Sequence, residues 1–259
     1  MKNLFHKIVA ASSALALLGA GCGAAPESAQ ESRPSAASME ANTLASGSID
    51  GCTHEYLPLK NGHSITYVSR MAGKDSTFTY AVKNVSGKKA TIEYDFGNAS
   101  KIEIEFECSE DGIRALSQVD FSKAFGGPIA SATSKTKSAS GELVPKDFHV
   151  GSAWSQTFES EAEIENEAMK NMGMSKFTTI MKMDHKAVGE ESVTVPAGTY
   201  TAIKVETDMT ITTKFSPTAA PTESKMKTTA YWVKGIGMVK SVSGEGSTAS
   251  LMEATAVTK

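Results

Sequence analysis

Polar and apolar residues alternate along most of the chain after residue 50, and this period of two constrains the fold more than any other feature. In residues 101–106 (KIEIEF), the two isoleucines and the phenylalanine fall on one side, and the two glutamates fall on the other. This pattern is typical of antiparallel strands with one face buried and the other in water. It recurs at residues 64–68, 77–82 and 90–96. We therefore predict a mainly β protein with little helix.

Turn sequences separate the predicted strands. They are Asn61-Gly62, Ser86-Gly87, Gly97-Asn98 and Asp111-Gly112. Residues 188–206 predict a tight hairpin, because Pro196 presets φ at the first corner and Gly198 accepts a left-handed conformation. Further strands are expected at residues 210–214, 228–242 (with an internal turn) and 246–256, and a loop is expected at 216–224.

The segment 158–169 (FESEAEIENEAM) is ambiguous between helix and strand. Its composition favours a helix, with a capping box from Ser160 to Glu163. As a strand it places every glutamate on one face. Pairing with residues 176–186, with partner numbers adding to about 343, would match charges on the wet face and apolar groups on the other. We favour the hairpin.

The N-terminus predicts export. Lys2 and Lys7 precede an apolar run from Ile8 to Leu18, which as a helix spans about 16 Å, roughly half a bilayer core. Residues 1–21 are therefore expected to be a lipoprotein signal peptide with acylation of Cys22, and ordinary secretion with cleavage after Ala20 is the alternative. Residues 22–49 are expected to form the lipidated, disordered tether, and residues 50–259 a single β-rich domain.

Charge and cysteine content narrow the class of protein. Without the two leader lysines the chain has 24 basic and 29 acidic side chains, a net charge of −5, which argues against nucleic acid as a partner. In an oxidising compartment Cys52 and Cys108 are expected to form a disulfide. Two buried free thiols or a metal pair are the alternatives.

Few residues suggest chemistry. The sequence contains no H-E-x-x-H and no G-x-S-x-G motif, so we expect no enzyme, no cofactor and no metal, with a hydrolase as a minor alternative. The glutamate stripe from Glu159 to Glu167 is expected to be solvated, since a flat row does not converge on Ca²⁺. Met181, Met183 and His185 share one face of a strand. Core packing, a lipid-accommodating lining and Cu(I) binding are the three interpretations, in that order.

Three motifs together resemble a group of bacterial envelope lipoproteins. They are YLPLKNGHSITY (Tyr56 to Tyr67, with Ile65 where Trp is usual), EESVTVPAGTYTAIKV (190–205) and YWVKGIGMVK (231–240). The resemblance, over roughly residues 56–251, implies a curved antiparallel sheet, a half-barrel or open barrel of the kind found in LolA- and LolB-like proteins. Those proteins hold lipid or acyl groups on a concave apolar face, and no catalytic residues are implied.

The expected function is that of a non-enzymatic lipoprotein of the cell envelope, with the outer membrane as the expected location. It would be held to the membrane by its N-terminal lipid and would bind a lipid or acyl ligand on a concave face. The expected lining residues are Met181, Met183, Phe177, Ile164, Trp154 and Trp232. The alternative is a structural or assembly component that docks another envelope protein through a sheet edge.

Overall fold

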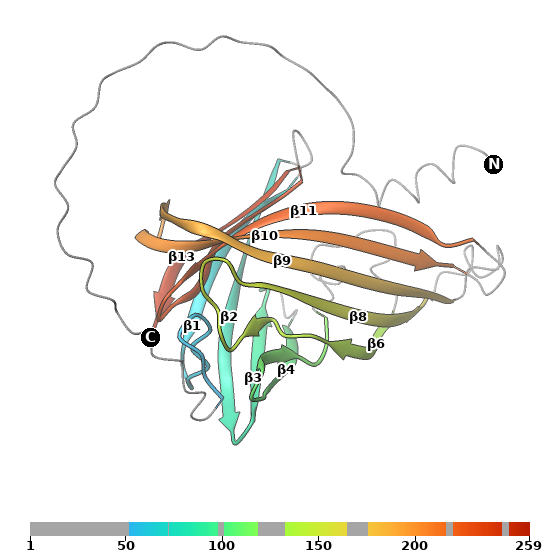
Figure 1. Ribbon diagram of the computed structural model, residues 1–259, viewed down its shortest axis with the longest axis horizontal. Coiled ribbons are helices and arrows are strands. Elements are labelled where there is room, and N and C mark those ends of the chain that lie inside the picture. The colour runs from blue at the N-terminus through green and yellow to red at the C-terminus, as the bar shows by residue number, and fades with distance from the viewer. Residues whose placement is uncertain are drawn as a thin grey trace, which may run out of the picture.

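The named strands in the described part of the chain all belong to one antiparallel sheet. The computed structural model describes residues 52–71, 73–97, 101–118, 133–164, 176–215, 220–244 and 249–259. In these ranges the chain forms a 13-stranded sheet and no α-helix, in the order β6-β8-β9-β10-β11-β12-β13-β1-β2-β3-β4-β5-β7. The sheet is curved and open (Figure 1). The mainly β prediction and the curved, unclosed sheet are therefore confirmed.

The strands differ greatly in length, and the longest lie in the second half of the chain. Their bounds are β1 Ser64–Met71, β2 Lys74–Ser86, β3 Lys89–Asp95, β4 Lys101–Cys108, β5 Gly112–Ala115, β6 Thr133–Ser140, β7 Val144–Pro145, β8 Ala153–Glu163, β9 Lys176–Val195, β10 Gly198–Lys214, β11 Thr222–Val233, β12 Gly237–Ser243 and β13 Ser250–Thr258.

Two meanders, β1 to β5 and β8 to β13, join through the pairing of β1 with β13. Figure 1 shows β8, β9, β10 and β11 as long, curved strands lying beside one another, with β1 and β2 running steeply across their direction. We call these four long strands the β8–β11 arm. The strong twist is typical of large antiparallel sheets and turns one face of the arm toward the face of the first meander.

Most predicted strands are present, and two differences from the prediction have a common cause. β6 was not predicted because its sequence, TSKTKSAS, has no large apolar residue and therefore no hydrophobic alternation. Among the described strands it pairs with β8. The predicted loop at 216–224 was too long, because β11 already begins at Thr222. In both places main-chain pairing with a neighbouring strand outweighs the local composition.

The hairpin of β8 and β9 is present, but the predicted register was wrong by four residues. Glu163 lies opposite Lys176 and Ala162 opposite Phe177, so partner numbers add to 339. Both registers keep the same residues on the same faces, so alternation alone cannot distinguish them. In the observed register Phe158 lies opposite Met181, which pairs two large apolar side chains. Residues 165–169 of the ambiguous segment lie outside the described residues.

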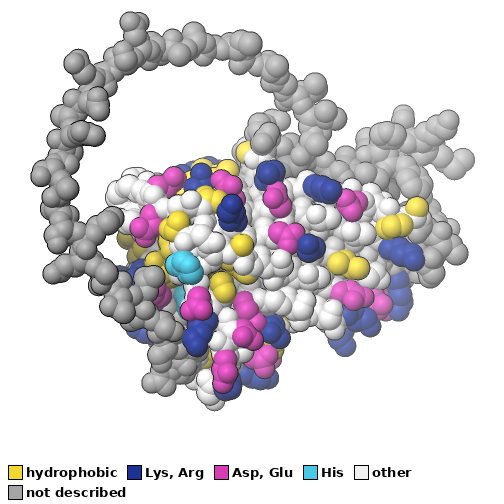
Figure 2. Space-filling view, in the orientation of Figure 1, with side chains coloured by type: hydrophobic (Ala, Val, Ile, Leu, Met, Phe, Trp, Pro, Cys, Tyr) yellow, Lys and Arg dark blue, Asp and Glu magenta, His cyan; other side chains and the backbone are white. Residues whose placement is uncertain are grey.

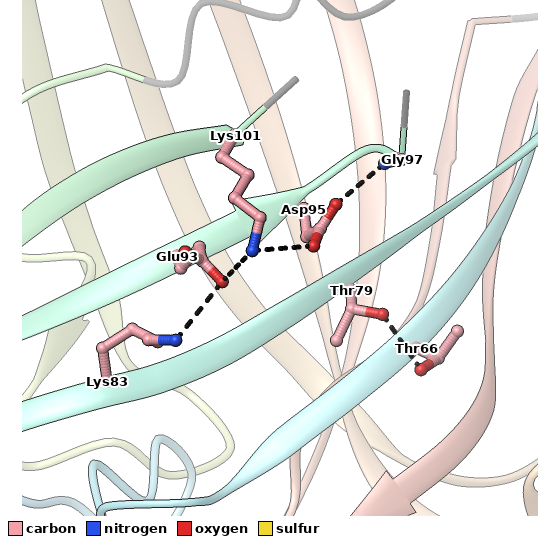
Figure 3. Close-up of polar contacts among 7 residues, drawn as sticks. All are labelled: Thr66, Thr79, Lys83, Glu93, Asp95, Gly97 and Lys101. Carbon is pink, nitrogen blue, oxygen red and sulfur yellow. Dashed lines mark hydrogen bonds and ion pairs between the residues drawn. The ribbon is translucent and has the colours of Figure 1, made fainter. Parts of the chain in front are cut away.

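The outer face of the first meander is polar. Lys101 extends from β4 to both Glu93 and Asp95 of β3, with Nζ–O distances of 3.1 and 3.0 Å, and Lys83 of β2 reaches Glu93 at 3.5 Å (Figure 3). Charges of both signs are also intermixed over the face seen in Figure 2. Exposed pairs of this kind contribute little stability each, but they mark this face as the solvated one.

The opposite, inner face of the first meander is packed. An aromatic cluster covers it, with ring centroids of Tyr67 and Phe78 5.2 Å apart and those of Tyr80 and Tyr94 5.7 Å apart. Burial raises the pKa of Tyr67 well above its usual value, and its hydroxyl donates to the Met238 carbonyl at 2.6 Å. Ile92, Ile113 and Val144 nearby are wholly buried. This half of the sheet therefore has a filled core.

Residues before β1 pack into the same core. Cys52 is bonded to Cys108 at the end of β4, with Cα atoms 5.2 Å apart, as predicted. The buried His54 accepts a hydrogen bond at Nδ1 from the Tyr56 amide, so its Nε2 carries the proton and donates to the Lys146 carbonyl. His63 is also buried, and its Nε2 lies 2.9 Å from the Ile236 carbonyl. These two histidines therefore have structural roles.

None of the described segments forms a helix long and apolar enough to cross a membrane.

Candidate ligand-binding face

The inner face of the β8–β11 arm is built from three consecutive rows of side chains. The register places these sets side by side across the four strands: Trp154, His185, Thr207 and Thr228; then Gln156, Met183, Met209 and Met226; then Phe158, Met181, Ile211 and Ser224. Side chains directly opposite one another in such rows have Cβ atoms about 4.5–5.5 Å apart. No side chain in these three rows is an acid, a lysine or an arginine.

Four methionines dominate this surface, and we call Met181, Met183, Met209 and Met226 the methionine face. All four are half-buried and so remain partly accessible. The residues between them on the same strands, such as Lys182, Asp184 and Asp208, point to the opposite face and form ion pairs or lie exposed there. The period of two thus separates a thioether surface from a charged one.

The residues predicted to line a ligand site fall into two groups. Met181 and Met183 lie on the methionine face, and Trp154 occupies the adjoining row. Trp232 is buried further along β11, four residues beyond the Trp154 row, with its ring centroid 6.2 Å from that of Phe148. Phe177 and Ile164 lie toward the other end of the arm. Phe177 lies opposite Ala162, 5.8 Å from the ring of Phe215, and Ile164 is fully buried.

Met209, Met226 and Gln156 were not predicted from the sequence. Each is the one glutamine or methionine of its own strand, and only the register brings it next to Met183. Extending the pairing of the hairpin predicted at 188–206, in which partner numbers add to 393, would place Thr210 opposite Met183. The irregularity between Lys204 and Val205 lowers the sum to 392 and places Met209 there instead, so the sequence alone does not predict this contact.

The end of the methionine face nearest the core is closed by aromatic side chains. Phe148, from the segment that follows β7, packs edge-on against Trp154 with centroids 5.5 Å apart, and against Tyr56 at 4.9 Å. Trp154 in turn stacks on the His185 ring, with centroids 5.0 Å apart and planes 22° from parallel. The core therefore extends past Trp154 along β8, since Phe158 belongs to it and Met183 packs against it.

Burial keeps His185 uncharged. Loss of hydration lowers the pKa of its imidazole to about 4, and the nearby Asp184 carboxylate opposes this shift only partly. Its Nδ1 lies 2.8 Å from the Thr207 hydroxyl. At neutral pH this ring is therefore a neutral hydrogen-bonding group on the inner face, and it adds no charge to it.

Stability should consequently fall in mild acid. The pKa of His185 is about 6.5 in the unfolded chain and about 4 in the fold, so between these values the unfolded state binds more protons and the free energy of unfolding decreases as the pH falls. The His185 contribution to this loss is about 3 kcal/mol. Urea unfolding of the wild type and of His185→Gln at several pH values would measure it. The glutamine variant should have the flatter profile, and parallel profiles would contradict the assignment.

Three buried nitrogen atoms at this end of the arm have no hydrogen-bond partner in the described part of the chain: Trp154 Nε1, Gln156 Nε2 and His185 Nε2. Gln156 is only 3% exposed. Leaving a buried polar group unpaired costs about 1–3 kcal/mol, so native proteins rarely keep several together without a partner such as water or a ligand. The arrangement is suited to receiving a group that accepts hydrogen bonds.

The same residues are poorly suited to a metal ion. No group of three His, Cys, Asp or Glu side chains in the described ranges could hold one. Met183, Met209 and His185 are the soft donors that Cu(I) would use. The neighbouring indole and amide N–H groups offer no free lone pair, however, and would be left unpaired beside the cation. The two N–H donors favour an acceptor over a metal.

Comparison with known proteins identifies the fold. A candidate lipoprotein from Parabacteroides distasonis superposes with a TM-score of 0.51 at 16% identity, over 80% of this chain and 99% of that one. A candidate exported protein with a YmcC-like fold from Bacteroides fragilis gives a TM-score of 0.47 at 15% identity, over 77% of this chain and 97% of that one. The hypothetical lipoprotein YmcC from Escherichia coli gives 0.36 at 9% identity, over 74% and 83%. None of the curated proteins matches.

The family is shown by a sequence match. The family model described as DUF3108-like matches residues 62–248, which extend from the turn before β1 to the residues before β13. The match therefore includes the whole β8–β11 arm and the first meander. Since it spans well over half of the sequence, this chain belongs to the DUF3108-like family.

Proposed function

We propose that this chain is a non-enzymatic lipoprotein of the cell envelope that binds a lipid or other ligand with an acyl chain on its methionine face. The observation that carries the proposal is the set of four half-buried methionines in adjacent positions on one side of a curved, open sheet. Methionine is unbranched and flexible, so such a surface adapts to an irregular apolar partner. The accessible part of these four side chains is apolar surface that a ligand could cover.

Membrane attachment would come from the N-terminus. Cys22, the proposed site of acylation, lies outside the described residues, and the tether that follows it would hold the domain clear of the head groups. A half-barrel of the LolA- and LolB-like kind, which the sequence motifs imply, would supply a concave face that receives acyl chains. An outer-membrane location is part of the same proposal.

Docking through a sheet edge is the less favoured alternative. The outermost strand on one side, β6, exposes Lys135 and Lys137 along its length. The outermost strand on the other side, β7, has only two residues, and one of them is Pro145, which has no N–H to donate. Lysines, prolines and short strands are features by which proteins discourage edge-to-edge pairing.

Native mass spectrometry of the acylated protein, purified from the envelope of its host, tests the proposal. We expect a population whose mass exceeds that of the acylated chain by the mass of one lipid, and organic extraction should recover that lipid. The variant Met183→Asp/Met209→Asp, which places two charges on the methionine face, should lose it. A well-folded wild-type protein that carries no lipid and binds no hydrophobic probe would overturn the proposal.

A further inference from the structure

We propose that the ligand of the methionine face is an acyl ester or amide, and that its uncharged carbonyl oxygen is bound by Trp154, Gln156 and His185. This inference rests on the proposed function and adds the chemistry of the ligand's polar end. It starts from the three buried nitrogen atoms that have no partner among the described residues.

The first step concerns where these atoms lie. Trp154 and Gln156 are two residues apart on β8, so their side chains leave the same face of the strand about 6–7 Å apart. His185 on β9 lies directly opposite Trp154 and stacks on its ring, and Met183 lies opposite Gln156. The three nitrogen atoms thus come from neighbouring positions at the junction between the aromatic closure and the methionine face.

The second step concerns what they can bind. An indole N–H and an amide NH₂ are donors in every protonation state. His185 Nε2 is also a donor when Nδ1 accepts the hydrogen bond of the Thr207 hydroxyl, whose oxygen is 2.8 Å away. The ligand group that pairs with these donors must therefore be a hydrogen-bond acceptor. A carbonyl oxygen has two lone pairs and can accept from two of the donors at once.

The third step concerns charge. The three rows of the inner face carry no lysine or arginine, and His185 stays neutral because burial lowers the pKa of its imidazole. A carboxylate or phosphate placed here would lose its hydration without gaining a cation, which is strongly unfavourable. An uncharged carbonyl has no such penalty. The neutral donors and the apolar face together fit an acyl chain that enters along the methionines with its carbonyl at Gln156.

A matched pair of ligands tests this directly. Monodecanoylglycerol and its ether analogue, 1-O-decylglycerol, share head group and chain but only the ester has a carbonyl. Displacement of Nile red from the full chain carrying Cys22→Ala, which removes the thiol proposed to be acylated, would give both affinities. We expect the ester to bind about tenfold more tightly than the ether, the difference that one or two good hydrogen bonds produce. Decanoate at neutral pH should bind more weakly than the ester.

Variants connect the preference to the proposed residues. Gln156→Leu should reduce the ester-to-ether ratio toward one, whereas Gln118→Leu, the same change at a half-buried glutamine just after β5, should leave it unchanged. Equal binding of ester and ether by the wild type would overturn the inference, with water as the partner of the donors, and would leave the proposed function standing. If decanoate binds more tightly than the ester, the proposal that the bound group is an uncharged carbonyl is overturned. If neither the ester, the ether nor decanoate binds, both proposals are overturned.

Discussion

Replacing Gly141 by alanine is expected to destabilise the protein by about 4 kcal/mol or more, among the largest effects of a single methyl group. Gly141 follows β6 and has a φ of +78°, where an L-residue is strained. A Cβ atom there would collide with the Ser155 carbonyl oxygen and would lie 3.0 Å from the Gln156 Cα. These are backbone atoms of β8, so the strand would have to move, and with it the end of the methionine face.

Gly151→Ala is the matched control. Gly151 also has a positive φ, of +99°, but nothing lies within 4 Å of the position that its Cβ would occupy. Backbone strain alone should then cost about 1–2 kcal/mol. Urea denaturation of both variants would separate strain from collision. If the two variants lose the same stability, the close approach of Gly141 to β8 is not real.

Removing the disulfide should have the second large effect. Cys52 and Cys108 are separated by 56 residues, and closing a loop of this length stabilises the fold by about 4 kcal/mol in the chain-entropy estimate. Without the bond, residues 52–63 would be held only by hydrogen bonds and packing, such as the bond from the Gly235 amide to the Glu55 carbonyl. Cys52→Ser/Cys108→Ser should lower the free energy of unfolding by about that amount, measured by urea denaturation.

The wild-type protein under reducing conditions is the control, and it should match the double variant. Single variants are less informative, because each leaves an unpaired thiol. An unchanged urea midpoint on reduction would mean that packing of the N-terminal segment, and not the covalent bond, determines its position.

The sequence predicts the strands well because each strand has one wet and one buried face. In KIEIEF, alternation alone assigns β4 and its buried side. It fails for β6, whose eight polar and small residues have no buried face to reveal them. It also cannot determine the β8–β9 register. Shifting one strand by an even number of residues keeps every side chain on its face.

The candidate site was predictable only in part, for the same reason. Met181 and Met183 are visible as alternate residues of one strand, but Met209 and Met226 join them through the pairing of β9 with β10 and of β10 with β11. The polar end of the candidate site was even less predictable from the sequence. The importance of Gln156 comes from its buried Nε2, which has no hydrogen-bond partner among the described residues. This depends on packing and has no counterpart in the sequence pattern.

The most direct test of the account is NMR of the protein labelled with ¹³C at the methionine ε-methyl groups, titrated with monodecanoylglycerol. The chain has 12 methionines, each giving one methyl signal that substitution can assign. We predict that the signals of Met181, Met183, Met209 and Met226 shift together and saturate. That of Met71, which is 45% exposed at the end of β1, should not move. Uniform small shifts of exposed methionines, with the four signals of the arm unchanged, would contradict binding at the methionine face.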